Sequence, residues 1–296
     1  MVCACIDIGS NTTRLLVASP RSNGLRELAQ QRAFTRIGRA LRDDGCIELS
    51  KIEEVAEVVA TQARTADELG AEALRAVATA AIRQAGNRDE LVAAVRAHCG
   101  IEVHVLTDEE EARLAFVGAT RALTEFAMGT IAVVDVGGGS SEVAIGTLEG
   151  GMTWSASLRL GSGSLADAYL RSDPPAASEL HAIRQHVAGA FEGLEIPRAD
   201  LGVAVGGSAT SLRRLVGALL EPETLERGLR VLAGGPAAEV ARTYELDPER
   251  VKLLPAGILL IEEASTRLGL PLQIARGGLR EGVILEMMGS PRTTTA

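Results

Sequence analysis

The sequence predicts an α/β protein built from two related domains. The main observation is a pattern that occurs twice, at 5–12 and 133–140, in which an apolar strand ends in Asp-x-Gly and continues into small hydroxyl-bearing residues. A second observation is that apolar residues alternate in some segments, as in strands, and recur every three or four residues in others, as in helices. One copy of the pattern in each half of the chain favours a duplicated fold.

Composition limits the classes of function. The chain has 296 residues, of which 46% are hydrophobic, enough for two domains with cores of their own. A net charge of −9 and an aromatic share of 2% argue against a nucleic-acid binder or a protein of anionic membrane surfaces. No apolar run approaches the ~20 residues that span a bilayer, and Met1 leads directly into a strand without a signal peptide. We therefore expect a cytoplasmic protein.

In the first half, apolar spacing and capping residues predict the elements. Ser50 with Glu53 and Thr107 with Glu110 have the spacing of capping boxes, in which two residues at a helix start bond each other's backbone N–H groups. Glycine at 70 and at 100 ends a helix. The expected order is a strand at 5–8, strands at 13–18 and 25–33 joined by a turn at 22–24, a helix at 50–70, a strand at 74–78, a helix at 89–98, a strand at 101–106 and a helix from 107.

The second half starts with the repeated strand at 131, which continues in a hairpin at 142–147. The expected elements after it are helices at 165–170 and 179–191, a strand at 201–205, helices at 212–220, 237–244 and 256–268, a strand at 272–275 and a helix at 279–288. We place a domain boundary near the helix after Thr107. The predicted domains are 1–118, completed by the C-terminal helix 283–290, and 119–282, followed by a disordered tail at 291–296.

Both Asp-x-Gly turns are candidate phosphate sites. In the first, Asp7 ends a strand, and Ser10, Asn11 and Thr12 offer hydroxyl, amide and N–H donors. Backbone N–H groups in such a turn bind anions, and an Asp beside them can hold a hydrated divalent cation. A hairpin without a ligand is the alternative for either turn alone. Acids at both strand ends favour the ligand, because they repel anions unless a metal or proton intervenes.

The second turn has more metal-binding character. Gly137, Gly138, Gly139 and Ser140 leave the backbone open to a phosphate. The residue seven positions after each Asp is Arg14 in the first copy and Glu142 in the second, and solvent-facing side chains are the alternative at both. Across a tight turn, Asp135 and Glu142 can meet at one Mg²⁺ or Mn²⁺, with Asp7 as a further candidate ligand.

Other candidate residues lie on neighbouring elements. The capping box and the helix dipole account for Glu110 but not for Glu111, whose carboxylate could deprotonate an attacking water. Arg83, with Asn87 four residues on and on the same helix face, is a candidate phosphate contact. Gly207 and Ser208 follow a strand and could offer N–H groups to an anion. A surface arginine and an empty turn are the alternatives.

Five segments, in this order, resemble the exopolyphosphatase/guanosine pentaphosphate phosphohydrolase (Ppx/GppA) family. They are residues 7–12, 110–113, 135–142, 206–210 and 278–282. The resemblance implies two ribonuclease-H-like domains of the actin/hexokinase/Hsp70 superfamily with an interdomain cleft. It also implies hydrolysis of a terminal phosphoanhydride, with Glu111 as catalytic base, Asp135 and Glu142 as metal-linked acids and 137–140 as phosphate loop.

The resemblance further implies a homodimer that acts on inorganic polyphosphate or on pppGpp. Relatives with long C-terminal helical extensions bind long polyphosphate, and the chain stops after the core, so we expect short polyphosphate chains. Arg39 stands where many relatives have an acid, and Ser164 where some have arginine. Two alternatives are a polyphosphate:nucleoside-diphosphate phosphotransferase and a non-catalytic polyphosphate or alarmone sensor.

Overall fold

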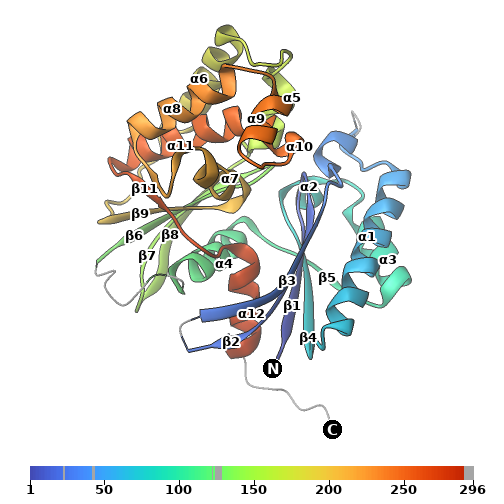
Figure 1. Ribbon diagram of the computed structural model, residues 1–296. Coiled ribbons are helices and arrows are strands. Elements are labelled where there is room, and N and C mark those ends of the chain that lie inside the picture. The colour runs from blue at the N-terminus through green and yellow to red at the C-terminus, as the bar shows by residue number, and fades with distance from the viewer. Residues whose placement is uncertain (23, 42–43, 122, 124–128, 290–296) are drawn as a thin grey trace. The chain divides into compact units, whose positions relative to one another are not determined.

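The computed structural model describes residues 1–22, 24–41, 44–121, 123 and 129–289 (Figure 1). The predicted tail at 291–296 lies outside the described residues. The chain folds as two compact units, Met1–Ala122 with Gly277–Ala296, and Leu123–Arg276. The domain limits expected from the sequence, 118 and 282, stay predictions.

The first unit is a mixed sheet with helices on both faces. Its strand order is β3-β2-β1-β4-β5, with β1, β2 and β3 antiparallel and β1, β4 and β5 parallel. The strands are β1 (Cys3–Ile8), β2 (Thr13–Arg21), β3 (Gly24–Ala33), β4 (Ala73–Ala78) and β5 (Val103–Val105). The helices are η1 (Ile37–Ala40), α1 (Leu49–Glu68), α2 (Ala80–Gln84), α3 (Arg88–Cys99), α4 (Asp108–Arg121) and α12 (Leu279–Gly289).

Alternation along β1 explains the two cores of this unit. Ala4 and Ile6 pack in the cluster that includes residues of α1 and α3, whereas Cys3 and Cys5 pack with residues of α4 and α12. Successive side chains of a strand point to opposite faces, so one apolar strand serves both layers. Figure 1 shows α1 and α3 on one side of this sheet and α12 on the other.

The second unit repeats this sheet plan and is richer in helices. The sheet order is β10-β11-β9-β6-β7-β8, again with an antiparallel hairpin followed by parallel strands. The strands are β6 (Ile131–Val136), β7 (Ser141–Thr147), β8 (Gly151–Leu158), β9 (Leu201–Val205), β10 (Leu219–Leu220) and β11 (Leu272–Ile274). The helices are α5 (Ser162–Tyr169), α6 (Ala177–Ala190), α7 (Gly206–Val216), α8 (Pro222–Ala233), α9 (Ala237–Thr243), α10 (Pro248–Val251) and α11 (Leu254–Leu268).

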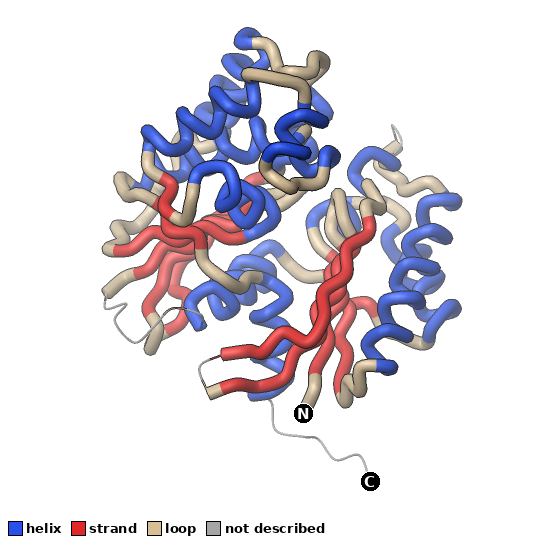
Figure 2. Tube along the Cα trace, in the orientation of Figure 1, coloured by secondary structure: helices blue, strands red, loops and turns tan. Residues whose placement is uncertain are grey.

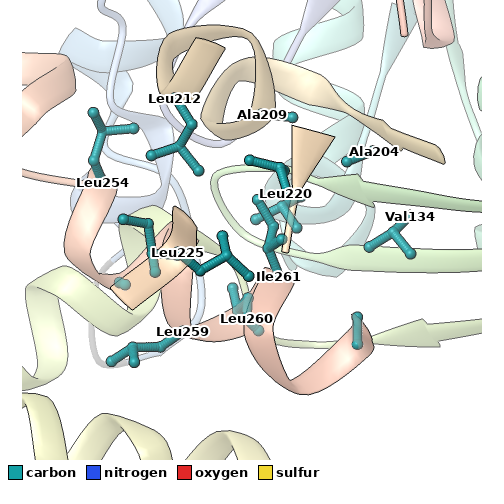
Figure 3. Close-up of a cluster of buried hydrophobic side chains, with 14 of the residues drawn as sticks. Val134, Ala204, Ala209, Leu212, Leu220, Leu225, Leu254, Leu259, Leu260 and Ile261 are labelled. Carbon is teal, nitrogen blue, oxygen red and sulfur yellow. The ribbon is translucent and has the colours of Figure 1, made fainter. Parts of the chain in front are cut away.

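The core of the second unit lies between its sheet and helices (Figure 2). Figure 3 shows Val134 of β6 and Ala204 of β9 near Leu260 and Ile261 of α11. The first eight residues of α11, 254–261, are apolar and buried on every side, as expected of a central helix that other helices also cover. This packing fixes the strand ends at which the candidate turns stand.

The two sheets confirm the predicted duplication. The strands β1, β2, β3, β4 and β5 occupy the sheet positions of β6, β7, β8, β9 and β11. In both units the repeated strand is central, with a hairpin partner on one side and a parallel strand on the other. Each Asp-x-Gly turn therefore stands at the carboxyl end of a central strand, where ligands of α/β folds bind.

Some sequence predictions were wrong in detail. Helix α1 begins at Leu49, so Ser50 lies inside it, and no side chain caps it. Arg83 and Asn87 do not share a helix, because α2 ends at Gln84 and Asn87 precedes α3. The helix expected at 212–220 ends at Val216 and is followed by β10. The sequence reading missed β8 and α8. No helix among the described residues is long and apolar enough to cross a membrane.

Candidate functional site

The two repeated turns have the same backbone geometry. In the first, the N–H of Gly9 donates to the carbonyl of Thr12 at 3.0 Å. In the second, the N–H of Gly137 donates to the carbonyl of Ser140, also at 3.0 Å. The hydrogen bond joins the residues two and five positions after the Asp in both copies, so the turns are structurally equivalent.

The residues opposite the two aspartates differ in charge. Asp7 pairs with Arg14 across β1 and β2, and Asp135 pairs with Glu142 at the same register across β6 and β7. Directly opposite residues of antiparallel strands share a face, with Cβ atoms about 5 Å apart. The first unit therefore places a carboxylate beside a guanidinium, and the second places two carboxylates side by side.

Asp7 is balanced by cations of its own unit. Burial raises the pKa of Asp7, and the guanidinium groups of Arg280 and Arg14 act in the opposite direction. Arg280, at the start of α12, is 8% exposed and donates from Nη1 to the carbonyl of Leu15 at 3.3 Å. The charge of Arg280 therefore acts on Asp7 of β1. A metal ion would therefore meet less uncompensated negative charge here than beside the two carboxylates of the second unit.

Asp135 and Glu142 suit a divalent cation. Glu142 is 2% exposed, and its Oε1 accepts a hydrogen bond from the Ser157 hydroxyl at 3.0 Å. Two neighbouring carboxylates, one deeply buried, repel each other unless a cation or proton lies near. Within the described ranges no three His, Cys, Asp or Glu side chains converge as a metal-binding group. An ion such as Mg²⁺, which keeps several waters, can be held by one or two carboxylates such as these.

Helix α5 supports the glycine turn of the second unit. The N–H groups of Ser162 and Gly163 donate to the carbonyls of Gly137 and Gly138, both at 2.9 Å. A Cβ on Gly161 would lie 2.3–2.5 Å from backbone atoms of Gly138 and Gly139, so only glycine fits there. These bonds engage the turn's carbonyls, which leaves the anion-binding capacity of the turn to its N–H groups.

Ser164 has a structural role in the same helix. Its hydroxyl accepts a hydrogen bond from the N–H of Gly161 at 3.0 Å and contacts the Gly161 carbonyl at 3.1 Å. The serine that stands where some relatives have arginine is therefore part of the start of α5. Gly161 was not predicted as a site residue, and no local pattern distinguishes it from other glycines before helices.

The third glycine turn lies beside Asp135. Gly206, at φ +87°, begins α7, and a Cβ there would lie 2.3 Å from Oδ1 of Asp135. A Cβ on Gly207 would lie 2.8–3.0 Å from the guanidinium of Arg250, a residue of α10 that is 5% exposed. The Ser208 hydroxyl is fully buried and makes no hydrogen bond within the described part of the chain. The start of α7 thus offers N–H groups near both a carboxylate and a guanidinium.

Arg250 is a candidate that sequence reasoning missed. It follows Asp247, whose carboxylate accepts the N–H of Glu249 at 2.9 Å and caps α10. Nothing in this short helix signals a buried arginine, since Arg250 stands between acidic and basic residues, Glu249 and Lys252, that are common on surfaces. Only the tertiary packing of α10 brings the guanidinium to Gly207.

The three glutamates at the start of α4 have distinct environments. Glu110 forms the predicted capping box with Thr107: the Glu110 N–H donates to Thr107 Oγ1 at 3.1 Å, and the Thr107 N–H to Glu110 Oε2 at 2.9 Å. That backbone hydrogen bond lowers the pKa of Glu110. Glu109 is exposed, whereas Glu111 is 7% exposed. Glu111 is therefore the buried carboxylate that capping does not use.

Arg83 binds Glu111 directly. Its Nη1 donates to Glu111 Oε2 at 2.9 Å and to the carbonyl of Leu106 at 2.8 Å, and its Nη2 donates to Asp108. We predicted Arg83 as a phosphate contact, and the structure brings it to the predicted catalytic base. Asn87 instead bonds the backbone of Ile47 and the Glu90 side chain.

The first turn also contacts the segment after β3. The N–H of Arg36 donates to the carbonyl of Asn11 at 3.0 Å, and the N–H of Gly38 to that of Ser10 at 2.8 Å. Ser10 and Thr12 are each 8% exposed. Arg39, noted in the sequence as a departure, is exposed on η1.

The predicted site residues thus form two groups. In the first unit Asp7 and Arg14 face each other beside the turn 9–12, and Arg83 holds Glu111. In the second unit Asp135 and Glu142 face each other beside the turn 137–140 and the start of α7 at Gly207. A cavity of about 520 Å³ in the first unit, lined in part by Leu74 and Met287, contains none of these residues.

Comparison with known proteins identifies the family. The sequence model of the Ppx/GppA phosphatase family matches residues 16–291. The chain belongs to this family. It is 30% identical to exopolyphosphatase 1 of Mycobacterium leprae over 98% of this chain and 91% of that protein. It is 26% identical to the guanosine-5'-triphosphate,3'-diphosphate pyrophosphatase of Photobacterium profundum over 98% of this chain and 60% of that protein.

Solved structures agree with the fold. The Ppx/GppA family member from Aquifex aeolicus superposes with a TM-score of 0.82 at 27% identity and covers 97% of each chain. An exopolyphosphatase from Cytophaga hutchinsonii superposes with a TM-score of 0.85 at 21% identity over 97% of this chain and 98% of that one, which supports the fold alone. The predicted family, the actin-like α/β fold and the enzyme class, a hydrolase of this family, are confirmed.

Proposed function

We propose that this protein releases terminal orthophosphate from inorganic polyphosphate, with Mg²⁺ or Mn²⁺ on Asp135 and Glu142. The observation that carries the proposal is the direct pairing of these two acids beside a glycine turn whose carbonyls are engaged by α5. Such a pair holds a divalent cation, and such a turn binds a phosphate through its N–H groups. We propose pppGpp as the second substrate, because it also ends in a phosphoanhydride.

The proposal assigns the chain's own groups to binding and proton transfer. The N–H groups of Gly138, Gly139 and Ser140, with those at Gly207 and Ser208, would bind the terminal phosphate oxygens, since the Gly137 N–H already donates to the Ser140 carbonyl. Ser10, Asn11, Thr12 and Arg14 are proposed as further phosphate contacts. The metal, when bound, would neutralise negative charge on the transferred phosphoryl group.

The proposal gives the water chemistry to Glu111. Its carboxylate would accept a proton from water as the water oxygen bonds the terminal phosphorus and the bridging P–O bond breaks. The products are orthophosphate and a chain one phosphate shorter, and the proton on Glu111 then passes to solvent. Arg83, at 2.9 Å from Oε2 of Glu111, orients that carboxylate.

Replacing Glu111 by Gln tests this assignment. Glu111→Gln removes the base but keeps the size of the side chain, so we expect kcat to fall by about 10²–10⁴ with little change in substrate binding. The measurement is release of orthophosphate from purified protein with polyphosphate and with pppGpp, with Mg²⁺ and with a chelator. Glu109→Gln, an exposed acid in the same helical turn, is the control. Unchanged turnover in Glu111→Gln would exclude Glu111 as the base.

The same assay separates the alternative functions. A phosphotransferase would form ATP when ADP is added with polyphosphate, and a sensor would bind polyphosphate without releasing phosphate. The pairing of the buried Glu111 with Arg83 favours hydrolysis, because a sensor has no need of a base. We further propose a homodimer, which light scattering of the purified protein would test.

A further inference from the structure

We propose that Arg32 and Arg36, together with Arg14, bind the phosphates that follow the terminal one in a polyphosphate chain. This inference rests on the proposed hydrolysis of polyphosphate and names further binding residues for that substrate. All the groups concerned lie in the first unit, next to the turn 9–12.

The sheet places Arg14 and Arg32 side by side. They are direct partners across the antiparallel strands β2 and β3, as Asp7 and Arg14 are across β1 and β2. The three residues therefore form one row on one face of the sheet. Arg14 and Arg32 thus set two guanidinium groups next to each other at the edge of the turn 9–12.

Arg14, Arg32 and Arg36 are called the arginine cluster here, and the Phe34 ring orients two of its members. The Cζ atom of Arg32 lies 5.0 Å from the centroid of the Phe34 ring, and that of Arg36 lies 6.0 Å from it. Guanidinium groups at this range are attracted to the ring, which restricts two long and otherwise flexible side chains. The half-buried ring thus gathers two cations at one place.

The backbone ties this cluster to the turn proposed to bind phosphate. The Arg36 N–H donates to the Asn11 carbonyl at 3.0 Å, and the Arg36 backbone is left-handed at φ 49°. A left-handed conformation is costly for a residue with a Cβ, so the surrounding bonds must stabilise it. A buried hydrogen bond between the hydroxyls of Thr13 and Thr35, at 3.0 Å, holds the residue before Arg36 against β2.

The chemistry of the cluster favours a phosphate chain over a nucleoside. Guanidinium groups pair with phosphate oxygens in charge-assisted hydrogen bonds, and a polyphosphate presents such oxygens at every unit. The Phe34 ring already carries guanidinium groups, so it is not an open platform on which guanine would stack. The ligand that fits is therefore inorganic polyphosphate longer than the shortest substrates, which departs from the short chains expected from the sequence.

The test compares a double variant with a matched control. Arg32→Gln/Arg36→Gln removes both charges, and Arg21→Gln/Arg26→Gln removes two arginines from the far end of the same β2–β3 hairpin. We expect KM for long polyphosphate to rise about tenfold or more in the first variant and to stay unchanged in the control. Because the lost contacts bind ground state and transition state alike, kcat is retained. With tripolyphosphate the rise in KM is smaller.

Further measurements keep the outcomes distinct. Arg32→Gln alone, at an exposed position, serves if the double variant does not fold. An equal KM of wild type and variant for long polyphosphate overturns the inference, as does a rise confined to pppGpp. If the wild type releases no phosphate, the proposed function fails. In that case calorimetry measures the affinity of wild type and double variant for long polyphosphate without metal. Weaker binding by the variant supports the inference, and equal binding overturns it.

Discussion

At the scale of residues, one position decides how the two repeats differ. The residue opposite the strand-end aspartate is Arg14 in the first unit and Glu142 in the second. With Arg14 and Arg280 near it, Asp7 has its counter-charges within the protein. Asp135 has a second carboxylate opposite it, and such a pair favours a cation close by. The sequence indicated this difference, and the structure supplied the register that makes the residues neighbours.

Arg83 is the residue whose assignment the structure changes most. Its contacts with Glu111, Asp108 and the Leu106 carbonyl use much of the donor capacity of the guanidinium. Its side chain therefore orients a carboxylate, whereas the sequence suggested a direct phosphate contact. The two roles differ in which kinetic constant they affect.

Replacing Arg83 by Met should lower kcat more than it raises KM. The variant leaves Glu111 without the guanidinium that fixes its direction, and a misplaced base costs about 10²-fold in rate. A lost phosphate contact would raise KM instead. Steady-state phosphate release gives both constants. Arg96→Met, an exposed residue of α3 paired with Glu102, is the control. A raised KM with intact kcat would restore the phosphate-contact role.

At the scale of elements, the sequence predicts best what local chemistry determines. The hairpins, the parallel strands, the Thr107 cap and helix α12 follow from alternation, turn residues and capping pairs. Helix α8 was not predicted, although its buried leucines, Leu225, Leu229 and Leu232, recur every three or four residues as in an amphipathic helix. The contribution of Gly161 and Arg250 could not be predicted, since it depends on how α5 and α10 pack against turns distant in sequence.

A methyl group at Gly161 should disturb the phosphate turn. In Gly161→Ala the Cβ meets backbone atoms of Gly138 and Gly139 at 2.3–2.5 Å, so the turn must move. We expect a loss of about 1–3 kcal/mol in the free energy of unfolding, as for other overpacked sites, together with weaker binding of orthophosphate. Denaturant titration and product inhibition by orthophosphate measure the two effects.

The matched control for this prediction is Gly189→Ala in α6. A Cβ on Gly189 meets no atom within 4 Å, and alanine is the better helix former, so that variant should be as stable as the wild type or more so. A Gly161→Ala protein that unfolds and binds orthophosphate like the wild type would show that the turn does not depend on α5.

At the scale of the whole molecule, duplication produced two similar frames with unlike charges. The strand order, the turn hydrogen bond and the register of the aspartates are repeated in both units. Duplication alone would predict two equivalent metal sites per chain. The two units differ at this position, with Arg14 in the first and Glu142 in the second. This difference predicts a single metal site, because a guanidinium opposite Asp7 repels a second cation.

Metal stoichiometry tests this asymmetry without any measurement of activity. We expect one Mn²⁺ per wild-type chain by calorimetry and by the electron paramagnetic resonance signal of free Mn²⁺. Glu142→Gln removes one of two carboxylate ligands and should weaken the site at least about tenfold, whereas Arg14→Gln, the matched change in the other repeat, should keep it. Two equal sites in the wild type, or loss of the site in Arg14→Gln alone, would contradict the assignment. Since both variants change the same register position in equivalent hairpins, a difference between them follows from the charge of the partner and not from the fold.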